Sequence, residues 1–257
     1  MSEVLENKAD KIGIVTVNRP KQLNSVNSET RKKMVKVFEE MEKDNEVSVV
    51  LLKGTKNKAF IAGADVKEFS KMKLKNRKEL ARDWRITEVI SKMSKPVIAM
   101  IDGFCLGGGL EIAMACDIRV CSNESKLGQP EINIGIIPGA GGTQRLTKLI
   151  GEGRAMEMIL TGRMINSDEA KKYGIVNFIF ESDELEERTM EIAQTIARKS
   201  SYAIKRAKKA IKAASEMRLS KGLKYEQKMF LECFKSEDGK EGINAFVEKR
   251  KPNFKGA

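Results

Sequence analysis

The chain has 257 residues, 41% of them hydrophobic, which is long enough for one large domain with a buried core. It contains no histidine, and its four cysteines show no C-x-x-C spacing. These features argue against a zinc site and exclude every catalytic triad or general base that uses histidine. The formal net charge is +12, but basic and acidic residues alternate and aromatic residues make up only 5%. This pattern favours a solvated basic surface over a nucleic-acid site.

The first 180 residues alternate between two kinds of segment. Short apolar and β-branched runs predict strands over 12–17, 47–54, 96–103, 118–121 and 175–180. Apolar residues at helical spacing predict helices from about residue 28 to 41 and over 141–151, 153–162 and 167–174. Strands that alternate with helices are typical of an α/β fold. No apolar run approaches the roughly 18 residues of a membrane span. The N-terminus lacks the apolar stretch of a signal peptide, so we expect a cytoplasmic protein that is not bound to a membrane.

The sequence changes character after about residue 181, where it becomes charged and helical without strand signals. We therefore expect a core domain over 1–195 and a helical region over 196–257. The helical region carries more apolar residues than a small bundle can cover, which indicates packing against the core or another subunit. These residues are Met217, Leu219, Leu223, Met229, Phe230, Leu231 and Phe234.

A glycine-rich stretch, GFCLGGGLEIAMACD at 103–117, joins a predicted strand to a predicted helix. Glycines allow close approach of a ligand or another backbone, and the unpaired amides of a helix start favour an anion. The anion could be a phosphate or an oxyanion that forms during reaction, but neither nucleotide-binding glycine motif is present. A tight turn between helix and sheet is the simpler interpretation. Glu111 sharpens the choice, because its apolar neighbours predict a buried carboxylate with a raised pKa.

A second carboxylate, Glu131, occurs in LGQPEINIGIIPGAGG at 127–142, again among apolar residues and beside glycines. Taken alone it could be a turn residue whose side chain faces water. Two such acids in a chain without histidine are, however, what acid–base chemistry requires. The pair Glu111 and Glu131 is therefore our candidate catalytic machinery.

These stretches resemble the crotonase superfamily, which includes the enoyl-CoA hydratases, and the resemblance covers nearly the whole chain. The matching segments are VTVNRPKQLNSVN (15–27), KAFIAGADVKEF (58–69), KPVIAMIDGFCLGGGLEIAMACDIRV (95–120), LGQPEINIGIIPGAGGTQRL (127–146), GIVN (174–177) and EGINAFVEKRKPNF (241–254). The resemblance implies an α/β spiral of ββα units with a helical C-terminal trimerisation region. It also implies a homotrimer, or a homohexamer built as a dimer of trimers.

The resemblance further implies an acyl-CoA thioester substrate. Its carbonyl oxygen would lie between the backbone amides of Ala64 and Gly108, an arrangement called an oxyanion hole. During hydration Glu111 would deprotonate the water that adds to C3, and Glu131 would give a proton to C2. Dehydration reverses these roles, and Gly139 would line the site near the water. No metal and no cofactor is implied, because coenzyme A is part of the substrate.

The same resemblance assigns the remaining contacts with coenzyme A. The segments that match coenzyme-binding regions contain Lys21, Ala62, Asp65, Val66 and Lys67. Three C-terminal residues, Phe230, Phe246 and Lys249, match positions that reach the adenine end of a neighbouring subunit's ligand. Core packing is the simpler interpretation for the two phenylalanines, and a solvated charged run for Lys249.

Other functions remain open at this point. Isomerases of the superfamily tend to keep only the second acid, so the two glutamates favour reversible hydration of a short-chain 2-enoyl-CoA over isomerisation or thioester hydrolysis. A protein of a different class, binding RNA through its basic surface, is the further alternative. Residues between 69 and 95 are expected to shape the acyl pocket, with Met72 and Trp84 bulky enough to shorten it.

Overall fold

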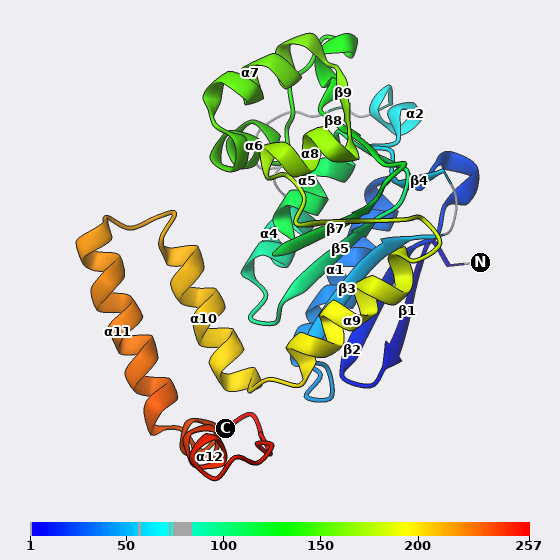
Figure 1. Ribbon diagram of the computed structural model, residues 1–257. Helices are drawn as coiled ribbons and strands as arrows, with labels where there is room; N and C mark the ends of the chain where they lie inside the picture. The colour runs from blue at the N-terminus through cyan, green and yellow to red at the C-terminus, as the bar shows by residue number, and fades with distance from the viewer. Residues whose placement is uncertain (1, 56–57, 72, 74–83) are drawn as a thin grey trace.

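The computed structural model describes residues 2–55, 58–71, 73 and 84–257 (Figure 1). Its framework is two β-sheets. The larger has the strand order β1-β2-β3-β5-β7-β10, in which β1 is antiparallel to β2 and the other neighbours are parallel. The bounds are β1 Val4–Ala9, β2 Ile12–Val17, β3 Val49–Gly54, β5 Val97–Ile101, β7 Ile118–Ser122 and β10 Phe178–Phe180. The smaller sheet has the order β4-β6-β8-β9, formed by β4 Ala59–Ile61, β6 Phe104–Leu106, β8 Lys126–Gly128 and β9 Met164–Asn166.

Successive strands are shared between the two sheets in a regular way. β3, β5 and β7 are parallel neighbours in the larger sheet, and the strands that follow them, β4, β6 and β8, are parallel neighbours in the smaller one. Each pair of strands is therefore one turn of a spiral, and the helices lie between turns. This arrangement confirms the α/β spiral that the sequence predicts.

The central strands of the larger sheet are buried on both faces, as expected when helices cover both sides of a parallel sheet. Along β3, Val50 and Leu52 belong to the core on one face, whereas Val49 and Leu51 belong to the core on the other. The first face packs against α1 (Ser28–Lys43) and α4 (Arg85–Lys92), and the second against α9 (Leu185–Ala197) (Figure 1). The larger sheet is thus a rigid base for the smaller one.

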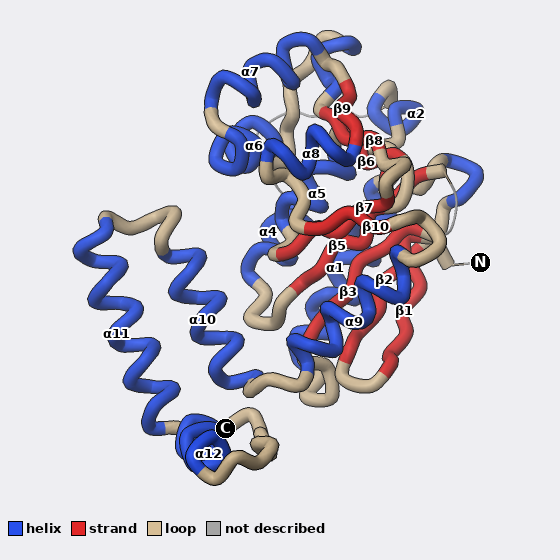
Figure 2. Tube along the Cα trace, viewed as in Figure 1, coloured by secondary structure: helices blue, strands red, loops and turns tan. Residues whose placement is uncertain are grey.

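The remaining helices of the core gather around the smaller sheet (Figure 2). They are α2 (Val66–Phe69), α5 (Gly108–Ala115), α6 (Gly142–Ile150), α7 (Glu152–Thr161) and α8 (Ser167–Tyr173). Two short 3-10 helices, η1 (Pro20–Gln22) and η2 (Pro130–Ile134), interrupt the connections. The helix α5 and the turn η2 directly follow β6 and β8, so the two glutamates lie on neighbouring turns of the spiral.

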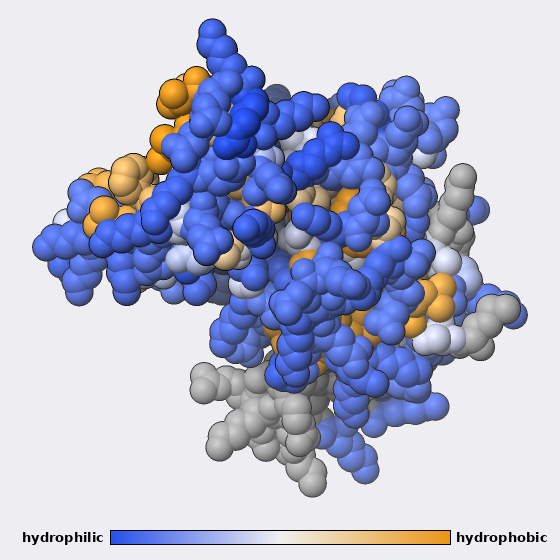
Figure 3. Space-filling view, turned by 90° about the horizontal axis from the view of Figure 1, so that it is seen from below, coloured by the Kyte–Doolittle hydropathy of each residue, from blue (hydrophilic) through white to orange (hydrophobic). Residues whose placement is uncertain are grey.

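The last three helices extend away from the sheets (Figure 1). They are α10 (Ser201–Ala213), α11 (Leu219–Lys235) and α12 (Glu237–Val247). Large apolar side chains are exposed along them and form patches on the surface (Figure 3). Among the described residues, no helix is long and apolar enough to cross a bilayer.

Most predicted elements are confirmed, with two kinds of difference. The last predicted strand starts at Phe178 and not at residue 175, because Ile175 and Val176 turn into the core ahead of it. β1 and the short strands β4, β6, β8 and β9 were not predicted, since three residues give no periodic signal and β1 is mostly polar. The predicted domain boundary at 195/196 falls in the last turn of α9, which packs on the larger sheet.

Candidate active site

The predicted catalytic groups meet because three successive turns of the spiral end at the same edge. Ala64 follows β4, Gly108 follows β6 and Glu131 follows β8, and these three strands are parallel neighbours. The carboxyl ends of parallel strands lie side by side, so Gly108 becomes adjacent both to Ala64, 44 residues earlier, and to Glu131, 23 residues later. Glu111 joins them from the first turn of α5.

Glu111 is the more deeply buried of the two acids, with 2% of its surface exposed. Its Oε1 accepts hydrogen bonds from the backbone amides of Ala140 and Gly142, both at 2.7 Å. Burial raises the pKa of Glu111, and the two amides oppose this effect because they stabilise the carboxylate. No described residue donates to Oε2, so one oxygen is anchored and the other is available for a reactant.

Glu131 lies in the turn η2 and is half-buried. Burial, and to a smaller extent the nearby charge of Glu111, raises its pKa to about 7. Its carboxylate lies against the glycine run: a Cβ on Gly107 would be 3.0 Å from Glu131 Oε1. At neutral pH this group can both give and accept a proton, as an acid–base catalyst must.

Gln129 lies between the two acids, and our sequence analysis did not identify it. It is fully buried, and with its amide nitrogen facing Glu131 it donates to both carboxylate oxygens, at 2.9 and 3.1 Å. A Cβ on Gly142 would lie within 3.0 Å of both the Gln129 side chain and Glu111 Oε1. The only sequence signal for Gln129 is its place beside Pro130 and Glu131 in an apolar segment. A glutamine that becomes buried there requires polar partners, and Glu131 is the nearest one in sequence.

Two backbone amides complete the group. Ala64 forms a parallel bridge with Val26, in which Val26 N donates to Gly63 O and Asp65 N donates to Val26 O. This pattern turns the Ala64 amide away from Val26. Gly108 is the first residue of α5, where helical amides have no partner within the helix. Among the described residues, neither the Ala64 nor the Gly108 amide donates a hydrogen bond.

The glycine run is required by close contacts on both of its sides. Gly107 has a φ of +51°, a left-handed conformation that disfavours other residues, and it faces Glu131. A Cβ on Gly109 would lie 2.0 Å from the carbonyl oxygen of Ile61 in β4. The run therefore lets α5 begin directly against β4, which brings the Gly108 and Ala64 segments together.

Known proteins of one family match this chain over nearly its whole length. The family model described as enoyl-CoA hydratase/isomerase matches residues 7–257. The chain belongs to the enoyl-CoA hydratase/isomerase family. A short-chain-enoyl-CoA hydratase of Clostridium acetobutylicum is 43% identical over 252 residues, which cover 98% of this chain and 97% of that protein. A crotonyl-CoA hydratase of Syntrophomonas wolfei is 36% identical, with coverage of 98% and 97%.

Solved structures agree with the family assignment. The crystal structure of an enoyl-CoA hydratase from Bacillus anthracis superimposes with a TM-score of 0.95 at 38% identity, and covers all of both chains. An enoyl-CoA hydratase from Geobacillus kaustophilus gives the same score and identity, with coverage of 100% and 99%. The spiral described above is therefore the family's fold.

Four of the residues predicted to contact coenzyme A line one open pocket of about 780 Å³. They are Lys21, Asp65, Val66 and Lys67. Arg19 and Lys71 add two further cations to the same lining. Ala62 lies next to this pocket, and its amide donates to the carbonyl oxygen of the pocket-lining residue Leu23 at 3.1 Å. The lining also contains Asp65, which is ion-paired with Arg19, and Glu68, so the segments 19–27 and 62–71 form one surface with an excess of cations next to Ala64.

The other predicted contacts are less directly placed. Gly139 immediately precedes Ala140, whose amide holds Glu111. Phe230 and Phe246 are 64% and 86% exposed, so core packing within one chain does not explain them. They lie on α11 and α12, with Lys249 just beyond, and these helices are far from α5 within one chain (Figure 1). Their contact with a neighbour's ligand remains a prediction.

The acyl-pocket candidates have different outcomes. Met72 lies outside the described residues. Trp84 is buried, and its ring lies against Gly108: a Cβ on Gly108 would be 2.2 Å from Trp84 Cη2.

The cysteines Cys105, Cys116 and Cys121 are buried, and burial raises the pKa of Cys116 and Cys121 to about 12. These thiols are therefore inert at neutral pH.

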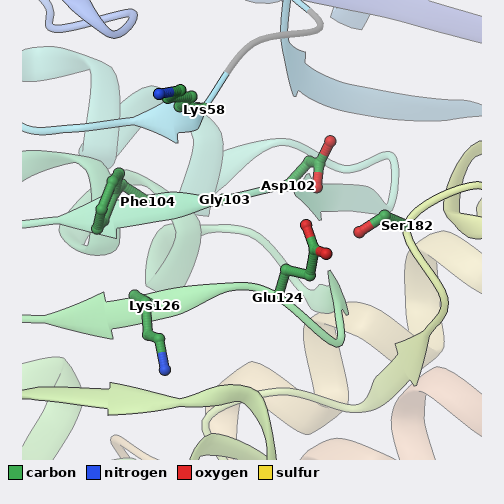
Figure 4. A pocket seen from close by; sticks show the side chains of 7 residues that line it. All are labelled: Lys58, Asp102, Gly103, Phe104, Glu124, Lys126 and Ser182. Carbon is green, nitrogen blue, oxygen red and sulfur yellow. The ribbon is translucent and has the colours of Figure 1, made fainter.

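A separate cavity of about 450 Å³ opens at the opposite ends of β6 and β8 (Figure 4). Phe104 and Lys126, the first residues of these strands, line it together with Asp102, Glu124 and Ser182. Both glutamates of the candidate site lie beyond the other end of the same strands. Within the described part of the chain, no cluster of acidic or sulfur side chains is arranged to hold a metal.

Proposed function

We propose that the protein catalyses the reversible addition of water to short-chain trans-2-enoyl-CoA thioesters, giving 3-hydroxyacyl-CoA. The observation that carries this proposal is that one buried and one half-buried carboxyl lie at the same edge of the spiral as two backbone amides that donate to no described residue. Relatives named short-chain-enoyl-CoA hydratase and crotonyl-CoA hydratase support the substrate class.

The proposed roles of the two acids follow from their different hydrogen bonds: Glu111 is held through Oε1 only, whereas Glu131 accepts from Gln129 through both oxygens. The thioester oxygen accepts hydrogen bonds from the Ala64 and Gly108 amides, which stabilise the enolate that forms. Glu111 Oε2 takes a proton from water, and the resulting hydroxide oxygen bonds to C3. The electron pair of the C2–C3 double bond moves toward the thioester, and C2 then takes the proton of Glu131. One proton enters the glutamate pair and one leaves it, so the reaction consumes only water. Loss of one oxyanion donor typically costs about 3 kcal/mol in the barrier.

The basic wall that contains Lys21 and Lys67 supports coenzyme A as the carrier, because its phosphates are anionic. We propose that no further cofactor takes part. We also propose assembly into trimers, or hexamers made of two trimers, through the exposed apolar faces of α11 and α12. In such an assembly Phe230, Phe246 and Lys249 of one subunit can contact coenzyme A bound to the next.

The decisive experiment is an assay of the purified chain on crotonyl-CoA, followed by loss of the enoyl-thioester absorbance. We expect saturable hydration, and faster reaction with short than with long acyl chains. Parallel assays measure conversion of a 3-enoyl-CoA to its 2-enoyl isomer and release of free thiol. Rapid isomerisation or hydrolysis without hydration would replace the proposal by one of those activities.

A further inference from the structure

Arg31 is a buried cation that the proposed chemistry does not use. It lies on the first turn of α1, and only 1% of its surface is exposed. Burying a guanidinium is costly unless it is paired and hydrogen-bonded. Its Nη2 lies 3.5 Å from Glu68 Oε2 and donates to Ser28 Oγ at 3.1 Å. Two further contacts lead to the oxyanion hole, one to each side of it.

The first contact reaches the Ala64 side. Arg31 Nη1 donates to Val26 O at 2.8 Å, and the same oxygen accepts from Asp65 N at 3.1 Å. Val26 is the bridge partner of Ala64, and its amide donates to Gly63 O at 2.9 Å. The direction of the Ala64 amide therefore depends on the position of Val26, which Arg31 fixes from behind.

The second contact reaches the Gly108 side. The Arg31 guanidinium lies over the Trp84 ring, with Cζ 4.6 Å from the ring centroid. Trp84 is buried, and its outer edge touches Gly108 so closely that a Cβ there would be 2.2 Å from Cη2. Stacking of a buried guanidinium on an indole is favourable and directional. The position of Trp84, and with it the start of α5, thus also depends on Arg31.

We propose that Arg31 is a positioning residue that fixes the distance and orientation of the two amides of the oxyanion hole relative to each other. This inference rests on the proposed thioester chemistry, because it assigns a function to the distance between the Ala64 and Gly108 amides. Arg31 does not touch the reacting atoms. It acts through Val26 on one side and Trp84 on the other, and a flat guanidinium can hydrogen-bond in its plane while it stacks on its face.

The test uses Arg31→Lys and Arg31→Gln in the full-length protein. Lysine keeps the charge opposite Glu68 but cannot stack on Trp84 and bond to Val26 at the same time. We expect kcat for crotonyl-CoA hydration to fall about tenfold or more in both variants, with KM changed by less than about twofold. The second readout is the absorbance of a bound 2,4-dienoyl-CoA, whose red shift reports polarisation of the thioester by the two amides. This shift should be smaller in both variants.

Lys95→Met is the matched control. Lys95 is also a buried cation, and it binds the carbonyls of Met41 and Asp44 at the other end of α1. This variant should lower the melting temperature but keep the wild-type red shift and kcat. If Arg31→Lys behaves in the same way, Arg31 is only structural and the proposal is overturned, even if Arg31→Gln does not fold. A wild-type protein with neither hydration nor a red shift would instead refute the proposed function itself.

Discussion

The spiral core buries most of its large apolar side chains, whereas the C-terminal helices leave most of theirs exposed. In the core, apolar side chains fill both faces of the larger sheet, and buried polar groups such as Glu111 and Gln129 have hydrogen-bond partners. In α10 the one buried residue is Lys208, and α11 buries only Met229. The apolar residues of α11, including Leu223, Phe230 and Phe234, face outward.

One chain therefore contains every catalytic group of the proposed site, but it leaves large apolar side chains of its C-terminal helices exposed. The exposed residues Leu219, Leu223, Phe230 and Phe234 lie on one face of α11, at spacings of four, seven and four residues. An apolar face of this kind is typical of an interaction surface. We therefore expect the core to fix the positions of the catalytic groups, and the C-terminal helices to be fixed mainly by other subunits.

Among the substitutions that compare the core with the C-terminal helices, the largest effect is expected from Gly109→Ala, which breaks the contact between α5 and β4. The new Cβ would lie 2.0 Å from Ile61 O, and a backbone atom cannot move aside without shifting the strand. We expect a loss of about 3 kcal/mol in the free energy of unfolding. Hydration should fall about a hundredfold, since the two amides separate. Denaturant unfolding and the crotonyl-CoA assay measure these changes.

Gly153→Ala is the control for that substitution, because nothing lies within 4 Å of a Cβ at this helical position. Its activity should equal that of the wild type. Equal effects of the two alanines would show that the Gly109 contact does not position the site.

The dependence of the hydration rate on pH tests the proton transfers that we assign to the core. In the proposed mechanism the reactive enzyme carries one proton on the pair Glu111 and Glu131. Hydration requires this proton on Glu131, and dehydration requires it on Glu111. Above the pKa of about 7 that burial gives Glu131, this proton is lost. Since hydration releases no net proton, kcat/KM for hydration and for dehydration should both fall about tenfold per pH unit above that value. Steady-state assays from pH 5 to 9 measure the profile. A flat profile up to pH 9 would contradict the assignment of the acid.

The double substitution Phe230→Ser and Phe234→Ser tests the outer face of α11. Both rings are exposed within one chain, so the fold of the core should be unaffected, whereas assembly should be weakened. Sedimentation velocity is expected to show smaller species than the wild type. Lys228→Ser, on another face of the same helix, should keep the wild-type assembly. Unchanged sedimentation of the double variant would exclude this face from the interface.

The smallest effect is expected at the junction between the two regions. Asp117 accepts from Lys208 Nζ at 2.5 Å and lies 3.3 Å from Lys212 Nζ. Asp117→Asn should destabilise the docking of α10 by about 2 kcal/mol, because the Lys208 pair is largely buried. Lys212→Met should cost less than about 1 kcal/mol, since that lysine is more exposed. Hydrogen exchange of the α10 amides measures both. Faster exchange in Lys212→Met than in Asp117→Asn would contradict this ranking.

The sequence predicted the elements that carry long periodic signals and the two acids that stand out among apolar residues. Glu111 is buried at the start of α5 as expected, because the surrounding Leu, Ile, Ala and Met residues have no other place to pack. The glycine run was expected to admit a ligand. The structure adds that it also admits Glu131, Trp84 and the backbone of β4.

The remaining parts depend on contacts that local pattern does not encode. Gln129, Trp84 and Arg31 acquire their positions only when the spiral turns stack on one another. The strands β4, β6 and β8 are three residues long and are stabilised by their neighbours and not by their own propensity. Long-range pairing of this kind decides the geometry of the site but leaves little trace in a single sequence.

The central claim is that two side-chain acids share the proton transfers beside one pair of amides. The most direct test compares Glu131→Gln and Glu111→Gln with the wild type, in crotonyl-CoA hydration and in exchange of the C2 protons of butyryl-CoA with deuterated water. We predict that hydration falls about a thousandfold in both variants, while C2 exchange is lost in Glu131→Gln and coenzyme A esters still bind. A variant of either glutamate that hydrates within about tenfold of the wild-type rate would contradict the two-acid mechanism.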